Sequence, residues 1–188
     1  MLRSKIADGN QKILIHISNF RKVKRVNDVI RVFSKIKKKI PIRLMMIGDG
    51  PERIEAEQLC RTLNVSEDVR FMGKVKSVKE FLSISDLFIL PSETESFGLV
   101  ALEAMSSGIP VISTNSGGLP EVNIDNETGF LVNVGDLDAM VEKCLYLLSD
   151  EKKLTLFKEN AYNHSYKFDL PKILPLYERL YNNLCSKK

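Results

Sequence analysis

Short apolar runs alternate with helix-spaced segments along almost the whole chain. Residues 12–18 (KILIHIS) indicate a buried strand. Residues 26–38 place Val29, Ile30 and Phe33 on one face of a helix. Further strands are expected at 43–47, 69–72, 87–90, 111–113 and 129–132, and further helices at 51–63, 78–84, 96–107, 136–148, 151–166 and 170–184.

This alternation predicts βαβ units and therefore the fold class. We expect an α/β domain with a Rossmann-like parallel sheet and helices on both of its faces. In open sheets of this kind ligands bind beyond the carboxyl ends of the strands. The loops that follow the predicted strands are therefore the places to look for a site.

Composition narrows the class of protein. The 188 residues are 44% hydrophobic, yet no apolar run approaches the roughly 18 residues that span a bilayer. The polar N-terminus does not resemble a signal peptide, so we expect a cytoplasmic protein without stable membrane insertion. The three widely spaced cysteines indicate free thiols. A net charge of +4 without interleaved aromatic residues argues against a nucleic-acid partner.

The most informative stretch is residues 91–110, PSETESFGLVALEAMSSGIP. It leaves a predicted strand, turns, and enters a helix for which Ser96 is the expected N-cap. Gly98 allows a ligand to approach the backbone closely. The free N–H groups of Gly98, Leu99 and Val100 would face that ligand at the positive end of the helix dipole, which suits a diphosphate.

Two glutamates flank this turn, Glu95 and Glu103. They are either solvated surface residues or binding residues, and Glu103 shares a helix face with Leu99 and Val100, which is unusual for a solvated glutamate. A retaining glycosidase would need its carboxyl groups roughly 5–5.5 Å apart. Eight helical residues rise about 12 Å, so two separate binding contacts are favoured over one catalytic pair.

The loop after the first strand, residues 18–25, is strongly basic. Arg21 offers bidentate contacts to a phosphate, and Lys24 offers a mobile point charge. At the end of the first strand both would face the same crevice as the 96–107 helix, although a plain basic surface loop remains the alternative. His16 lies inside the first strand and is expected to be a core residue. The Gly117-Gly118 turn is explained equally well by turn structure and by a sugar contact.

These residues resemble one large family. The spacing of Glu95 and Glu103 matches the E-x7-E signature of the retaining family 4 of GT-B-fold glycosyltransferases. The wider run ETESFGLVALEAMSSGIPV, the following GGLPEV, the early basic loop, GDGP at 48–51 and VRFMG at 69–73 fit the same family in order. Within it, SNFR-x-VKR and ETESFGLVALEAM are most similar to bacterial members that transfer N-acetylglucosamine from UDP-N-acetylglucosamine to L-malate for bacillithiol biosynthesis.

The resemblance implies roles for individual residues. Arg21 and Lys24 would bind the donor diphosphate, with Arg21 the firmer match because the two lie closer together than is usual in the family. Glu95 would contact the transferred sugar, and Arg21, Lys24 and Glu95 would be the catalytic set. Glu103 would hold the ribose hydroxyls. The remaining donor-binding residues are expected to be Asn19, Lys74, Val75, Ser96, Phe97, Gly98, Leu99 and Val100.

The resemblance also implies a division of the chain. Residues 1–170 would be the donor-binding domain, and residues 171–188 a helix that packs on an N-terminal acceptor domain absent from this sequence. The face carrying Leu174, Tyr177, Leu180 and Tyr181 would then be exposed, which favours association, including as a homo-oligomer. A small-molecule acceptor would bind through the absent domain, and the chain alone would bind donor without catalysis.

The expected partner is a UDP-sugar, which is a substrate, and the resemblance implies no cofactor and no metal. Three alternatives stay open. The chain could be a nucleotide-sugar-binding module without chemistry, or part of a transferase for another hexose and acceptor. The third alternative, a non-hydrolysing sugar-nucleotide epimerase, would not explain the E-x7-E signature.

Overall fold

A parallel sheet forms the centre of the computed structural model, which describes residues 2–185. Within those residues the strands run in the order β3-β2-β1-β4-β5-β6, and every neighbouring pair is parallel. The predicted Rossmann-like α/β fold is therefore confirmed. The strands are β1 (Lys12–Ile17), β2 (Ile42–Ile47), β3 (Val69–Gly73), β4 (Leu87–Leu90), β5 (Val111–Thr114) and β6 (Gly129–Val132).

Helices connect the strands much as the pattern predicts. The helix expected at 78–84 is one short turn, and the helix expected at 96–107 begins three residues later. Two short helices, at residues 3–6 and 119–122, were not predicted. The helices are α1 (Arg3–Ile6), α2 (Val26–Lys37), α3 (Arg53–Thr62), α4 (Lys79–Leu82), α5 (Leu99–Ser106), α6 (Leu119–Val122), α7 (Leu137–Leu148), α8 (Glu151–Ser165) and α9 (Leu170–Cys185).

Two apolar clusters hold the layers together, one on each face of the sheet. Successive residues of a strand point to opposite faces, so Leu14 joins one cluster while Ile13 and Ile15 join the other. On the first face α2 packs beside α3 and α7, and its Phe33 is fully buried. On the second face α5 packs against α8. Burying each large apolar side chain contributes about 1.5–3 kcal/mol, so both layers stabilise the sheet.

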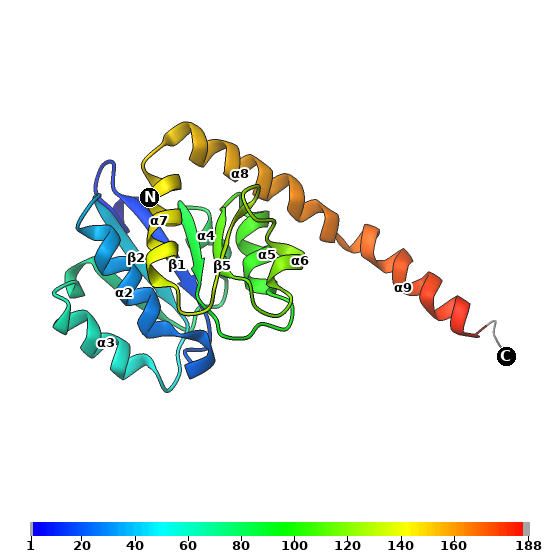
Figure 1. Ribbon diagram of the computed structural model, residues 1–188, viewed down its shortest axis with the longest axis horizontal. Coiled ribbons are helices and arrows are strands. Elements are labelled where there is room, and N and C mark those ends of the chain that lie inside the picture. The colour runs from blue at the N-terminus through cyan, green and yellow to red at the C-terminus, as the bar shows by residue number, and fades with distance from the viewer. Residues whose placement is uncertain (1, 186–188) are drawn as a thin grey trace.

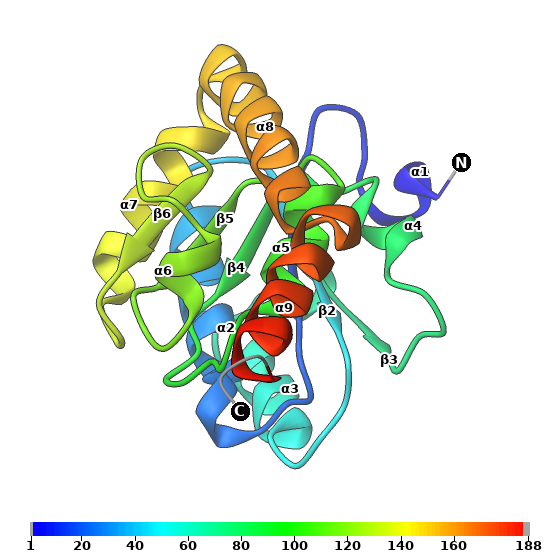
Figure 2. The ribbon, with the colours of Figure 1, turned by 90° about the vertical axis from the view of Figure 1, so that its right-hand side faces the viewer.

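The C-terminal helix α9 projects from this body (Figure 1), and in Figure 2 it points toward the viewer in front of α5. None of its described residues is buried, and the predicted exposure of Leu174, Tyr177, Leu180 and Tyr181 is confirmed. Pro175 lies inside the helix. The end of the predicted 171–188 segment, residues 186–188, lies outside the described residues. Between residues 2 and 185, no helix has the length and apolar character needed to cross a bilayer.

Candidate functional site

The site lies at the carboxyl ends of β1 and β4, the two central strands. From this pair the chain proceeds outward in opposite directions, which makes their junction the topological switch point where open α/β sheets bind ligands. The loops that follow are residues 18–25 and 91–98. The amide of Glu93 donates a hydrogen bond of 2.8 Å to the carbonyl of Val23 and joins the two loops.

An ion pair connects these loops side chain to side chain. The ammonium of Lys24 lies 2.5 Å from Oε1 of Glu95, and the hydroxyl of Ser92 donates to the same oxygen at 2.9 Å. The side chains of Lys24 and Glu95 are only 19% and 10% exposed. Two donors on Oε1 orient the carboxylate, and the pair places a cation and an anion together at the switch point.

The ion pair lines a pocket of about 390 Å³. Eight of the residues predicted from the sequence are gathered there: Asn19, Lys24, Glu95, Ser96, Phe97, Gly98, Leu99 and Val100. The lining also includes Ile17 and Ser18, which were not predicted. They could have been found from the rule that the last residues of a central strand face the ligand crevice.

The start of α5 corrects the prediction for Ser96. The helix begins at Leu99 and its N-cap is Gly98, so Ser96 is an exposed loop residue and not the cap. Gly98 has φ +91°, a left-handed conformation that glycine adopts without strain. A Cβ added there would also come within 2.8 Å of Leu119 Cδ2. The amides of Leu99 and Val100 form the first turn of α5, ahead of the helical hydrogen-bond ladder.

The Gly117-Gly118 turn packs against the backbone of the 91–98 loop. The amide of Gly118 donates to the carbonyl of Glu95 at 3.0 Å. A Cβ on Gly117 would lie 1.8 Å from that carbonyl oxygen, and a Cβ on Gly118 would lie 2.5 Å from the carbonyl oxygen of Ser96. These glycines therefore allow two backbones to approach closely, and they position the peptide that carries Glu95.

Arg21 of the 18–25 loop and His16 of β1 lie in different environments. The Arg21 side chain is exposed, and among the described residues it does not belong to the lining of the Lys24 pocket. The structure thus places Lys24, the less firm match, closer to the site. His16 is fully buried, as the core prediction requires. Burial lowers the pKa of His16 from 6.5 to about 4.

A second pocket of about 630 Å³ is lined by the segment after β3, by α4 and by the C-terminal half of α5. Glu103, an exposed residue of α5, lines it together with Val75. Lys74 is exposed and is not among the described residues of this lining. Most of the lining was not predicted, although its members lie in the segment and the short helix α4 that follow β3, or at the end of α5. They are Lys76, Ser77, Val78, Lys79, Leu82, Ser106 and Ser107.

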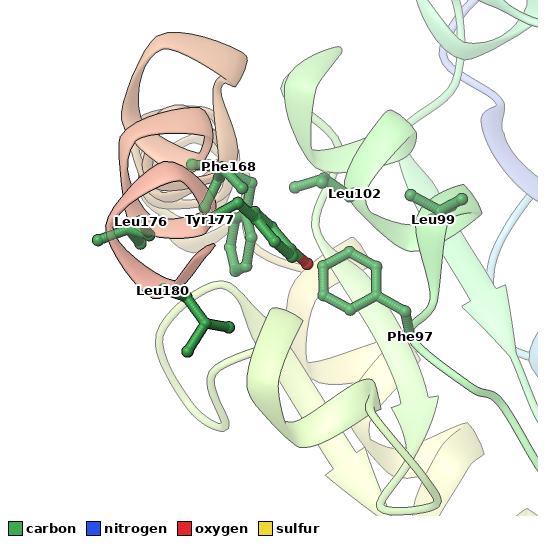
Figure 3. Close-up of a pocket in the computed structure, with 8 residues that line it drawn as sticks. Phe97, Leu99, Leu102, Phe168, Leu176, Tyr177 and Leu180 are labelled. Carbon is green, nitrogen blue, oxygen red and sulfur yellow. The ribbon is translucent and has the colours of Figure 1, made fainter. Parts of the chain in front are cut away.

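Glu95 and Glu103 therefore line different pockets, which fits two separate contacts and not a glycosidase pair. A third, apolar hollow of about 590 Å³ lies between α5 and α9. In Figure 3 Tyr177 of α9 points toward Phe97, which borders this hollow and the Lys24 pocket. In the part of the chain that the structure describes, no three His, Cys, Asp or Glu side chains form a metal-binding group.

Residues 2–164 match the family model described as glycosyl transferases group 1. The chain belongs to this family. It is 46% identical over 173 residues to the N-acetyl-alpha-D-glucosaminyl L-malate synthase of Bacillus anthracis, covering 92% of this chain and 45% of that protein. This membership favours a glycosyltransferase over an epimerase.

Two solved structures share the fold closely. Sucrose-phosphate synthase from Thermosynechococcus elongatus superposes with a TM-score of 0.88 at 26% identity, covering 99% of this chain and 49% of that one. TarM from S. aureus, in a complex that contains UDP, gives 0.85 at 25% identity, covering 92% of this chain and 36% of that one. The chain thus spans about half the length, or less, of these relatives.

Proposed function

We propose that this chain is the donor-binding half of a retaining glycosyltransferase that moves N-acetylglucosamine from UDP-N-acetylglucosamine to L-malate or another small acceptor. The observation that carries the proposal is the Lys24–Glu95 pair at the head of α5, in a pocket at the switch point of the sheet. The choice of donor and acceptor is supported by the 46% identity to a synthase named for those two groups.

In this proposal the donor occupies both pockets. Lys24 and the first amides of α5 neutralise the diphosphate, on which negative charge grows as the bond to the sugar breaks. Cations fixed at that point stabilise the transition state more than the ground state. Arg21, at the exposed edge of the same loop, adds a bidentate contact to phosphate.

The sugar and the nucleoside then lie on either side of the diphosphate. Glu95, whose Oε1 is held by Lys24 and Ser92, uses its second oxygen to accept from sugar hydroxyls. Glu103 in the second pocket accepts from the ribose hydroxyls, and Val75 contacts the base. The cations of this loop and the N-terminal amides of α5 supply the positive charge that neutralises the diphosphate. We therefore expect donor binding to be unchanged by EDTA.

The acceptor would bind on a second half that covers α9 and the apolar hollow beside α5. The exposed face of α9 and the share of 45% of the synthase's length support this arrangement. The chain alone would then act as a nucleotide-sugar-binding module, in a cytoplasmic enzyme. Transfer of another hexose to another acceptor remains the second candidate, because 33% of the length of a sulfoquinovosyl transferase from Arabidopsis thaliana is also matched, at 30% identity.

Calorimetric titration with UDP and UDP-N-acetylglucosamine tests the proposal directly. We expect the parent to bind both, and Glu103→Ala and Arg21→Ala to weaken binding by about tenfold or more, since each removes a charge-assisted hydrogen bond. Glu142→Ala, an exposed glutamate on α7, is the matched control and should bind like the parent. A folded parent that binds neither ligand, or a Glu103→Ala variant with unchanged affinity, would contradict the proposal.

A further inference from the structure

A short chain of hydrogen bonds runs beneath the Lys24 pocket and has no part in the roles assigned above. It starts at His16 on β1, which is 0% exposed. Nδ1 of His16 lies 2.9 Å from the carbonyl oxygen of Ile89 on the neighbouring strand β4. A carbonyl oxygen can only accept, so Nδ1 must carry the hydrogen and donate it.

The other ring nitrogen then determines the direction of the next bond. Nε2 of His16 lies 2.8 Å from the hydroxyl oxygen of Ser18. Burial is the main reason why the His16 pKa is only about 4, and Lys24 lowers it further while Glu95 opposes. The ring is therefore neutral at neutral pH, with its hydrogen on Nδ1. A neutral Nε2 has no hydrogen, so the Ser18 hydroxyl must donate to it.

The Ser18 hydroxyl has no hydrogen left to donate and can only accept further hydrogen bonds. Its oxygen accepts the amide of Phe20 at 3.3 Å, and its single hydrogen is given to His16. Ser18 also lines the pocket that contains Lys24 and Glu95. A phosphate oxygen is an acceptor too and cannot pair with such a hydroxyl. A ligand hydroxyl or N–H group can.

We infer that His16 is a positioning residue that holds Ser18 as an obligate hydrogen-bond acceptor for a hydroxyl or N–H group of the transferred sugar. The inference rests on the proposed function, because it takes the sugar of the donor to lie in the Lys24 pocket. It assigns Ser18 to the sugar and away from the diphosphate.

The tautomer can be measured without any ligand. In ¹⁵N–¹H correlation spectra of the free chain near neutral pH, His16 should show a protonated Nδ1 and an unprotonated Nε2. A ring protonated on Nε2, or on both nitrogens, would overturn the inference, because Ser18 would then be free to donate into the pocket.

Affinity for two ligands tests the role of the serine. Ser18→Ala should weaken binding of UDP-N-acetylglucosamine by about threefold to tenfold, the usual effect of one hydrogen bond, and leave UDP binding unchanged. Ser113→Ala is the matched control: this buried hydroxyl on β5 pairs with Asn123, and neither ligand should lose affinity. Equal weakening of both ligands by Ser18→Ala would overturn the inference.

A double-mutant cycle tests whether His16 acts through Ser18. His16→Phe keeps a ring of similar size without either hydrogen bond, and its loss of sugar-nucleotide affinity should not add to that of Ser18→Ala. His16→Gln, whose side-chain carbonyl can accept from Ser18, should recover part of the affinity and is the variant to use if His16→Phe does not fold.

The outcomes separate the two proposals. Losses that add in the cycle overturn the role of His16, while loss of binding in Glu103→Ala still supports the donor site. A folded parent that binds neither UDP nor UDP-N-acetylglucosamine overturns the proposed function for this chain, and the role of Ser18 falls with it.

Discussion

The buried histidine of β1 should make the stability of this protein depend on pH in a specific window. His16 is fully buried, and burial lowers its pKa from 6.5 to about 4 in the folded chain. In the unfolded chain the ring is solvated and its pKa returns to 6.5. Between these two values the unfolded state binds a proton that the folded state does not, so the free energy of unfolding falls as the pH is lowered.

The size of the effect follows from the shift. The pKa falls from 6.5 to about 4. One unit is worth about 1.36 kcal/mol, so lowering the pH from about 7 to about 4 should remove about 3 kcal/mol of stability through His16 alone. The loss is complete once the pH falls below the folded pKa. The charges of Lys24 and Glu95 both act on the ring, and their effects on its pKa oppose each other.

Urea denaturation across this range, for the parent and for His16→Phe, isolates the contribution. The variant should be less stable than the parent near pH 7, because the carbonyl of Ile89 loses its donor. Its stability should nevertheless depend less on pH. His164, whose pKa burial also lowers, is present in both proteins and cancels in the difference, as do the carboxylates. Parallel curves for the two proteins would refute the reasoning.

Further substitutions probe the site and its support. Gly117→Ala should destabilise the chain by more than about 2 kcal/mol, because a Cβ would clash with the backbone of Glu95. Gly108→Ala, also left-handed but with open space around it, should cost only the backbone strain of about 1 kcal/mol, and equal melting temperatures would contradict this. Asn123→Ala should cost about 3 kcal/mol in urea denaturation, since the two hydrogens of its buried amide nitrogen are shared among three acceptors. Lys24→Met should cost about 2 kcal/mol by leaving a 10% exposed carboxylate unpaired, and adding Glu95→Gln should restore most of it; a double variant as unstable as the single one would argue against the ion pair.

The local pattern of the sequence determined most of the fold. Every strand appears within one residue of the predicted range, because a short apolar run between turn residues is typical of a strand in a parallel sheet. The phase of Val29, Ile30 and Phe33 predicted the buried face of α2 in the same way. The family and its candidate glutamates were also readable, since they depend on residue types at fixed spacing along one segment.

Only the tertiary structure decided which of these residues meet. Lys24 and Glu95 are 71 positions apart, and their pairing follows from β1 and β4 being neighbours, which no local pattern specifies. Helix α5 starts at Leu99, after a left-handed Gly98 that has Leu119 close beside it, so capping preference alone placed the helix too early. The direction of the bonds at His16 comes from a carbonyl on another strand. Spacing along a chain governs local periodicity, whereas contacts between distant segments depend on how the sheet is ordered and packed.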